Sequence, residues 1–462
     1  MFFNSFVFFV FFIVFYLIFL VTVQEYKWFV FLIASWIFYA SFEPHFLLLL
    51  FFLITVDFYL ALAIKKAKQP SKKRIILLMS VVANTAALFF FKYTDFFISI
   101  HNSVFPWMAL PFLNIALPIG LSFYTFQGIS YLVDVYRSAV NPETSLKYFS
   151  LYKSAFPQLV AGPIERANHL LPQLKKKFVF SEVPYKEALL LIVVGLIKKV
   201  VIADNLAVVV NKIYGSYTDF NASTLAVAIV FFGFQIYCDF SGYVDIARGL
   251  GKLLGINFAI NFNRPYFSAG ISEFWHRWHI SLSSWVRDYI YIPLGGNRKG
   301  ARRQYLNLIA AMAVMGLWHG ANWTFLIWGI YHGLLLVFDK LLRRLPFAAG
   351  VPKIIKIGIT FCFINVGWIF FRSSSVAQSL AIIEKIFVFS SVGNLQYQPG
   401  MLLGFYLIFF LVAGEYLDEK YDIKKRIIQT NYFLFSIIIV MLIYILAFWG
   451  VRDSLSFIYF QF

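Results

Sequence analysis

Charged residues are scarce in this sequence: Asp, Glu, Lys and Arg together make up 13% of its 462 residues. A soluble protein of this length needs a charged surface around its core. The scarcity, with 61% hydrophobic residues and a mean hydropathy of +0.75, excludes soluble classes and indicates an integral membrane protein. Acids are rarer than bases, 22 against 40. In so apolar a chain this excess indicates basic cytoplasmic loops, and no nucleic-acid partner is expected.

Cysteine is also nearly absent. Cys238 and Cys362 lie in different apolar segments without CxxC or Cys/His spacing, so we expect inert thiols and no disulfide or metal site. The first apolar stretch, residues 2–23, lacks a basic leader and a small-residue cleavage site, and we expect a retained first span. No repeat or soluble linker divides residues 1–462, which predicts a single membrane domain in contact with the lipid bilayer.

Runs long enough to cross a bilayer, which takes about 20 residues, recur along the chain. They predict an all-α polytopic fold of about twelve spans, at residues 2–23, 28–42, 46–64, 75–91, 107–130, 188–210, 223–238, 304–319, 323–338, 354–371, 401–417 and 431–449.

Four loops concentrate positive charge: six Lys or Arg residues in Lys65–Arg74, four each in Arg298–Arg303 and Lys420–Arg426, and five in Lys340–Lys356. Twelve spans that begin outside place all four loops in the cytoplasm, in agreement with the positive-inside rule. We therefore expect a multi-pass protein of the inner (cytoplasmic) membrane with both termini on the extracytoplasmic side.

Three apolar pieces are predicted to be irregular. Pro111, Pro118 and Gly120 predict a broken or kinked span within 107–130. Residues 148–160 are too short to cross and fit a re-entrant segment. Residues 272–293 mix tryptophan with charge and predict one amphipathic helix, at the interface or dipping into the core.

Polar chemistry concentrates between Trp275 and Trp323, where three of the seven histidines lie; a fourth, His332, follows. Intramembrane polar residues are costly and mark functional sites. His319 falls in a break between two spans, beside glycines 316 and 320, which would let the backbone bend and a substrate approach. A neutral imidazole there could act as a general base; the alternative is a histidine satisfied by a helix end or by an aromatic belt.

The other histidines are weaker candidates. His276 and His279 are three residues apart and would share a helix face, but no third ligand is near, so metal binding is not expected. His332 suits a packing role, bonded to a neighbouring helix. The remaining three, His45, His101 and His169, are placed in loops and carry no motif.

Three further features have plain interpretations. The glycine-rich GLGKLLG (249–255) matches no phosphate-loop spacing, and PLGGN (293–297) reads as a turn. Intramembrane Asp57 is a plausible partner for a buried cation. The tail, residues 450–462, ends in FIYFQF: it is either an interfacial anchor or, through the Tyr459 phenol, an acyl acceptor.

An ordered set of motifs carries a family resemblance. Residues 239–332 contain DFSGYVDIARGLGKLLGINFAINFNRPY, ISEFWHRWHISLSSWVRDYIYIPLGGNR and GLWHGANWTFLIWGIYHG, and FNSFVFF, FPQLVAGPIER and FIYFQF extend the similarity towards both ends. The chain resembles the membrane-bound O-acyltransferases, and within them the alginate/peptidoglycan O-acetyltransferase branch.

The resemblance implies a ring of helices around a tunnel, where a cytoplasmic acyl donor meets an acceptor from outside. It gives His319 and His279 the catalytic positions and Tyr459 the role of acyl-accepting tail. Many relatives have arginine at the position of His276, which receives no role here. The resemblance also implies an extracytoplasmic SGNH-type O-acetyltransferase or esterase partner.

The expected function is O-acetylation of an extracytoplasmic polysaccharide such as peptidoglycan or alginate, with acetyl-CoA as donor and no bound cofactor. Arg277, Arg287, Trp318 and Asn322 are the candidate substrate-binding residues; the arginines would meet the phosphates of the donor. Two other classes stay open: a membrane transporter for a small or acylated metabolite, and a structural scaffold of the cell envelope.

Overall fold

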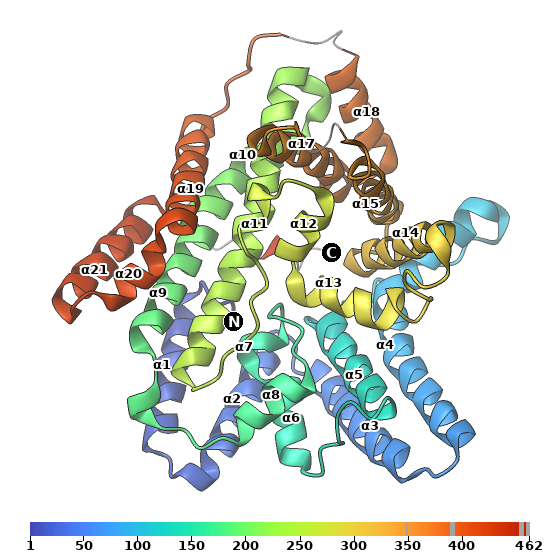
Figure 1. The fold of residues 1–462 in the computed structure, drawn as a ribbon, viewed down its shortest axis with the longest axis vertical. Helices are drawn as coiled ribbons and strands as arrows, with labels where there is room; N and C mark the ends of the chain where they lie inside the picture. The colour runs from blue at the N-terminus through green and yellow to red at the C-terminus, as the bar shows by residue number, and fades with distance from the viewer. Residues whose placement is uncertain (347–349, 389–392, 452–456, 459–462) are drawn as a thin grey trace. The chain divides into compact units, whose positions relative to one another are not determined.

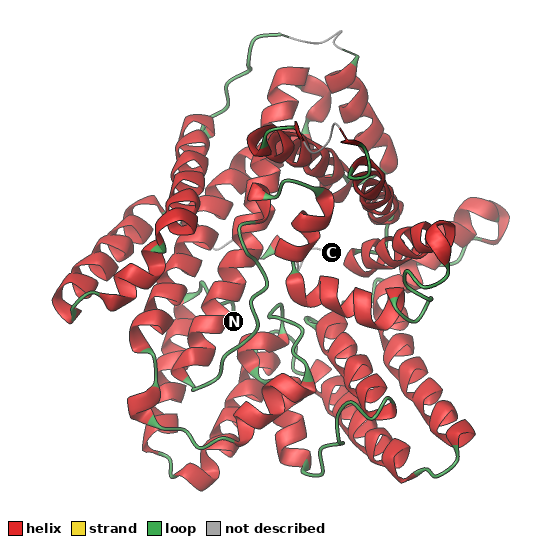
Figure 2. Cartoon of the chain, in the orientation of Figure 1, coloured by secondary structure: helices red, strands yellow, loops and turns green. Residues whose placement is uncertain are grey.

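The computed structural model describes residues 1–346, 350–388, 393–451 and 457–458. Within these ranges every regular element is a helix, as Figure 2 shows, and the all-α class is confirmed. The chain forms two compact units: unit 1 comprises residues 1–188 and 247–259, and unit 2 comprises 189–246 and 260–462. The predicted single domain and the ring around a tunnel stay predictions.

Seven of the described helices are long and apolar enough to cross a membrane. They are α3 (Phe46–Lys66), α4 (Pro70–Val104), α11 (Ala222–Leu253), α15 (Trp323–Leu342), α17 (Lys353–Arg372), α19 (Met401–Tyr421) and α21 (Tyr432–Trp449). A shorter apolar helix, α1 (Phe6–Val21), precedes them. The count of twelve is therefore not confirmed, because several predicted spans form shorter or interrupted helices.

Unit 1 contains the N-terminal helices, drawn from blue to green in Figure 1. Besides α1, α3 and α4 these are α2 (Lys27–Ala40), α5 (Leu121–Tyr136), α6 (Leu146–Ser154), α7 (Phe156–Leu159) and α8 (Ala167–Lys175), with the short 3₁₀ helices η1 (Gln24–Tyr26), η2 (Pro106–Met108) and η3 (Phe180–Glu182). The last residues of α11 also belong to this unit.

The predicted break within 107–130 is confirmed. No helix forms from residue 109 to residue 120, and α5 begins only after Gly120, whose φ is +77°. A Cβ at Gly120 would lie 2.5 Å from the carbonyl oxygen of Leu159. The Asp95 carboxylate accepts backbone hydrogen bonds from Leu113 and Asn114 at 2.8 and 2.9 Å, which ties this loop to α4.

Short buried helices replace a span between residues 146 and 159, as expected for a piece too short to cross. The Lys153 ammonium on α6 pairs with Asp57 at 2.9 Å, and neither side chain is exposed. Asn84 donates to the same carboxylate at 2.7 Å. This confirms Asp57 as the partner of a buried cation. A buried pair of this kind costs several kcal/mol to desolvate, so the additional hydrogen bond stabilises it.

Unit 2 contains the remaining helices. α9 (Tyr185–Leu196) begins at its boundary and continues as a π-helix, η4 (Ile197–Ala203), and then as α10 (Asp204–Gly215). The other elements are η5 (Tyr217–Asp219), most of α11, η6 (Pro265–Phe267), α12 (Ile271–Arg277), α13 (Ile280–Val286), the π-helix η7 (Arg287–Tyr291), α14 (Gly300–His319), α15, α17, α18 (Val376–Phe387), α19, α20 (Ile423–Gln429) and α21.

Glycines bring α14 and α15 into close contact. A Cβ at Gly316 would lie 2.2 Å from the Phe325 carbonyl oxygen and 3.0 Å from the Gly329 Cα. A Cβ at Gly320 would lie 2.1 Å from the Phe325 ring. The space beside both glycines is therefore filled by α15. This corrects the expectation that they leave room for a substrate, and the contact instead fixes His319, the last residue of α14.

We predict that Gly316→Ala destabilises the protein by about 1–3 kcal/mol, because the new methyl group meets main-chain atoms and forces the helices apart. Thermal unfolding in detergent measures this. Gly358→Ala is the matched control: Gly358 also lies within a helix, α17, and nothing approaches its Cβ position within 4 Å. Equal stability of the two variants would contradict the proposed contact.

Candidate functional site

The segment 272–293 is not one amphipathic helix, so that prediction is wrong. It forms α12, a break at Trp278 and His279, then α13 and the π-helix η7. His279 adopts a left-handed backbone conformation with φ +42°. This is uncommon for a residue other than glycine and persists only where the surroundings enforce it.

Asn261 enforces this break. Its carbonyl oxygen accepts from the Ile280 N–H at 2.9 Å, and its side-chain oxygen accepts from the Ser281 N–H at 2.9 Å. The Asn263 N–H donates to the Arg277 carbonyl oxygen at 2.9 Å. Asn261 is fully buried and so satisfies two of the N–H groups at the start of α13. The hydrogen bonds hold the backbone on both sides of His279.

The break separates His276 from His279. His276 is exposed and its Nδ1 lies 2.6 Å from the Ser272 carbonyl oxygen, whereas His279 is completely buried. The expected shared helix face is therefore wrong. Among the described residues no group of three His, Cys, Asp or Glu side chains could hold a metal ion.

His279 and His319 are neighbours of the same indole ring. The Trp318 ring centroid lies 6.0 Å from that of His279 and 4.8 Å from that of His319. Phe240 packs edge-on against His279 at 4.7 Å. Both histidines are buried, and burial lowers the pKa of His279 to about 3, so its imidazole is neutral at physiological pH.

Aromatic contacts continue from His319 to His332. Trp328 on α15 lies 5.1 Å from His319 and 4.8 Å from His332, centroid to centroid. Neither ring nitrogen of His332 has a hydrogen-bond partner among the described residues. His332 therefore packs as expected, against Trp275 and Trp328, but the expected hydrogen bond to a neighbouring helix is not seen. We call His279, Trp318, His319, Trp328 and His332 the histidine–tryptophan cluster.

The candidate substrate-binding residues have protein partners. Arg277 pairs with Glu273 at 2.8 Å, and Arg287 pairs with Asp288 at 2.8 Å. Asn322 caps α15 by accepting from the Thr324 N–H at 3.0 Å. These three side chains thus already have structural contacts, and of this set only Trp318 belongs to the histidine–tryptophan cluster.

A buried charge cluster, which sequence reasoning missed, lies elsewhere in unit 2. The Lys199 ammonium on η4 contacts Asp204 at 2.8 Å and Asp239 at 2.6 Å, and all three are buried. The adjacent Lys198 pairs with Asp245 at 2.8 Å. π-helices are rare in proteins, and those that occur often lie at functional sites. The available signal was the pair of lysines in a long apolar run: Asp239 lies 40 residues after Lys199, and Asp245 lies 47 residues after Lys198.

The C-terminal tail contacts this charge cluster. The Ile458 N–H donates to Asp239 Oδ2 at 2.8 Å. The Phe457 ring lies 4.8 Å from Tyr243, and the Lys199 ammonium lies 4.6 Å from the Phe457 ring centroid. Both tail residues are buried. Tyr459 itself lies outside the described residues.

One stretch of α11 joins the tail to the histidine–tryptophan cluster. Asp239 and Tyr243, one helical turn apart, contact the tail, while Phe240 contacts His279. The described end of the tail and the buried histidine therefore contact side chains that project from within five residues of one helix.

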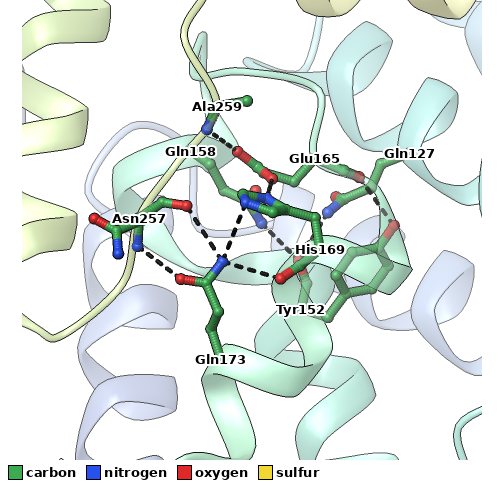
Figure 3. A network of polar contacts seen from close by, with 8 residues as sticks. All are labelled: Gln127, Tyr152, Gln158, Glu165, His169, Gln173, Asn257 and Ala259. Atoms are coloured by element: carbon green, nitrogen blue, oxygen red, sulfur yellow. Dashed lines mark hydrogen bonds and ion pairs between the residues drawn. The ribbon is translucent and has the colours of Figure 1, made fainter.

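Unit 1 has a polar network of its own, shown in Figure 3. Glu165, which is buried, lies 2.6 Å from Nδ1 of His169 and accepts from the Ala259 N–H at 2.6 Å. Gln173 donates to the Asn257 carbonyl oxygen at 3.2 Å and accepts from its N–H at 2.8 Å. The expected loop positions of His169 and His101 are wrong, since they lie on α8 and α4. The Glu165 hydrogen bond raises the pKa of His169.

Comparison with known proteins identifies the family of this chain. A model of the membrane-bound O-acyltransferase family matches residues 31–377, which include both histidines on either side of Trp318. The chain belongs to this family. With its apolar helices it is a multi-pass membrane protein of an acyltransferase family.

Two groups of relatives are named for O-acetylation. The peptidoglycan O-acetyltransferase of Helicobacter pylori is 38% identical over 76% of this chain and 72% of its own length. The probable alginate O-acetylase of Pseudomonas putida is 35% identical over 88% of this chain and 86% of its own. The teichoic acid D-alanyltransferase of Streptococcus thermophilus is 31% identical over 49% and 58%.

We predict that the Glu165–His169 contact makes stability depend on pH. The folded pKa of His169 is raised, so the contribution is complete below its ordinary value near 6.5 and is lost as pH rises through the folded pKa. Because His169 is half-exposed, the effect is on the order of 0.5 kcal/mol.

Thermal unfolding of His169→Gln and wild type from pH 5 to pH 9 measures this effect. The difference should shrink as pH rises. His45→Gln is the control, since His45 and Glu43 lie 3.7 Å apart and are both exposed. A difference that is constant across the range would contradict the assignment.

Proposed function

We propose that this protein takes an acetyl group from a cytoplasmic donor, acetyl-CoA, and passes it across the membrane for O-acetylation of an extracytoplasmic polysaccharide such as peptidoglycan or alginate. The names and extents of the similar proteins support the reaction class. The observation that carries the proposal is the stretch of α11 that contacts both the tail and His279.

His319 is assigned as the general base. It takes the proton from an accepting hydroxyl, and the hydroxyl oxygen attacks the thioester carbonyl of the donor. When the tetrahedral intermediate collapses, the C–S bond breaks, the acetyl group stays on the oxygen, and the thiolate of CoA receives the proton. The imidazole is buried and ringed by Trp318, Trp328 and Phe371, which excludes water that would hydrolyse the thioester.

His279 is assigned to donor orientation and to the developing oxyanion. A neutral imidazole can donate one hydrogen bond without adding a charge, and a fixed donor in a dry site stabilises negative charge strongly. Its left-handed backbone and the hydrogen bonds of Asn261 hold this imidazole in place.

The Tyr459 phenol is proposed as the first acceptor. An aryl ester is a reactive acetyl donor because the phenol, with a pKa near 10, is a good leaving group. The backbone hydrogen bond from Ile458 to Asp239 supports this role, since it anchors the residue before Tyr459 to α11, where the next residue, Phe240, packs against His279. An extracytoplasmic SGNH-type partner then transfers the acetyl group to the polymer.

The proposed setting is the inner membrane, with both termini outside and the basic loops in the cytoplasm. Arg277 and Arg287 would meet the phosphates of the donor only by exchanging their present partners, Glu273 and Asp288. Such exchange is inexpensive, because partly exposed ion pairs contribute little to stability.

We predict that His319→Ala lowers acetyl transfer from labelled acetyl-CoA to an extracytoplasmic acceptor by about 10²–10⁴-fold, the range for loss of a general base. Membranes with equal amounts of inserted protein are compared. His276→Ala is the control, since that histidine is exposed and its Nδ1 lies 2.6 Å from the Ser272 carbonyl oxygen of its own helix. Normal transfer by folded His319→Ala would exclude the assigned base.

We predict that Asp239 acts as a positioning residue through the tail. Asp239→Asn weakens the bonds that Asp239 accepts from the Lys199 ammonium and from the Ile458 N–H. Phe457→Ala removes the contact between the Phe457 ring and the Lys199 ammonium. Residues that act together give non-additive effects. The loss of transfer in the double variant should therefore be smaller than the two single losses combined, in free-energy terms.

Asp245→Asn provides the matched cycle, because Asp245 pairs with Lys198 at 2.8 Å, whereas Asp239 is the carboxylate that accepts from the Ile458 N–H. Its effect should add to that of Phe457→Ala. Additivity in both cycles, measured on initial transfer rates, would reduce Asp239 to a structural role.

A further inference from the structure

Six lysines surround a pocket of about 610 Å³ in unit 1. We call it the lysine pocket; its lysines are Lys27, Lys147, Lys175, Lys176, Lys177 and Lys252, and two glutamates, Glu25 and Glu182, also line it. The volume lies within the range of small-molecule sites. The lining comes from four separate stretches of chain: the α1–α2 turn, the start of α6, the end of α8 with the residues after it, and the end of α11.

Among the described residues, not every lysine of the pocket is paired with a carboxylate. In the described part of the chain Lys147 and Lys177 have no ion pair, and Lys176 pairs with Glu182 in a contact where both side chains are more than half exposed. Lys175 and Lys252 pair with Glu143 and Glu187 at 2.6 and 3.0 Å. Two lysines are thus available to a ligand outright, and a third can exchange its partner at small cost.

The pocket also offers aromatic surface and a fixed wall. The Lys147 ammonium lies 4.9 Å from the Trp28 ring centroid and 5.0 Å from that of Tyr148. Gln173 and Asn257, bonded to each other in the network of Figure 3, form one wall. Lys252 donates to Asn257 Oδ1 at 2.9 Å, which joins a cation to this wall.

The pocket lies at the basic end of unit 1. Lys65, in the loop of six positive residues, donates to Asn141 at 3.0 Å, and two residues further on Glu143 pairs with Lys175. The positive-inside rule assigns this end to the cytoplasm, where phosphorylated metabolites and anionic headgroups are both present.

We propose that the lysine pocket binds a phosphate-bearing ligand: either the phosphates of a soluble nucleotide such as CoA, or the headgroup of an anionic phospholipid. Lysine ammonium groups bind phosphate as point charges. Trp28 and Tyr148 offer ring faces for a base or for a headgroup edge. The pocket is lined by residues of unit 1, whereas the histidine–tryptophan cluster belongs to unit 2. The proposal that the ligand is soluble CoA rests on the proposed function.

The test compares two double variants that remove equal charge. Lys147→Gln/Lys177→Gln neutralises the two lysines without ion pairs. Lys68→Gln/Lys72→Gln neutralises two exposed lysines of the basic loop, which do not line the pocket. Each protein is placed in zwitterionic nanodiscs, and CoA, dephospho-CoA and inorganic pyrophosphate are titrated calorimetrically. In a second arm, native mass spectrometry counts phosphatidylglycerol retained from mixed-lipid nanodiscs.

The pocket variant should bind CoA at least tenfold more weakly than wild type, or retain less phosphatidylglycerol, while the loop variant matches wild type. Loss of CoA affinity identifies the soluble source, and loss of lipid identifies the headgroup. Unchanged binding in both arms, or equal losses in the two double variants, would overturn the proposal.

His319→Ala separates this inference from the proposed function. That variant should bind the phosphate probe as wild type does, whatever its transfer activity. Failure of acetyl transfer with intact, pocket-dependent binding would leave the lysine pocket standing. Normal transfer with no pocket-dependent binding would remove the pocket alone.

Discussion

The Lys199 ammonium, buried between the carboxylates of Asp204 and Asp239, is the interaction on which the site depends. Removing one partner of such a group costs about 3–5 kcal/mol, so it fixes the elements that carry it. It ties the π-helix η4 and the start of α10 to α11. It also orients Asp239 so that its second oxygen receives the Ile458 N–H. Asp239 thus holds the backbone of Ile458, and the same ammonium group lies 4.6 Å from the Phe457 ring centroid.

The chemistry of the site follows from dryness and fixed geometry. Packed tryptophan and phenylalanine rings surround two histidines whose imidazoles share Trp318 as a neighbour. Burial keeps His279 uncharged, which suits a hydrogen-bond donor to an oxyanion better than a second base. The Gly316–Gly329 approach fixes the end of α14, and Asn261 fixes the backbone around His279. The helix contact at Gly316 therefore positions His319, and the Asn261 hydrogen bonds position His279.

The length of the apolar runs and the prolines that interrupt them predicted much of the fold. The length of the apolar runs indicates the helical class, and Pro111 and Pro118 indicate the break before α5. The cost of an isolated charge in a membrane predicts a cation partner for Asp57. The break at His279 could not be predicted, because it depends on Asn261, eighteen residues earlier in the chain. The same limit applies to GLGKLLG, which matches no phosphate motif: tertiary folding alone places its Lys252 and Gly255 in the lysine pocket.

Covalent labelling of the isolated protein tests whether the C-terminal tail itself receives the acetyl group. Purified protein is incubated with acetyl-labelled acetyl-CoA without any partner, and its proteolytic peptides are mapped by mass spectrometry. We predict one acetyl group on the C-terminal peptide of the wild type and none on that of Tyr459→Phe or His319→Ala. Transfer to an added acceptor by Tyr459→Phe at the wild-type rate, with no label on the wild-type tail, would contradict this prediction.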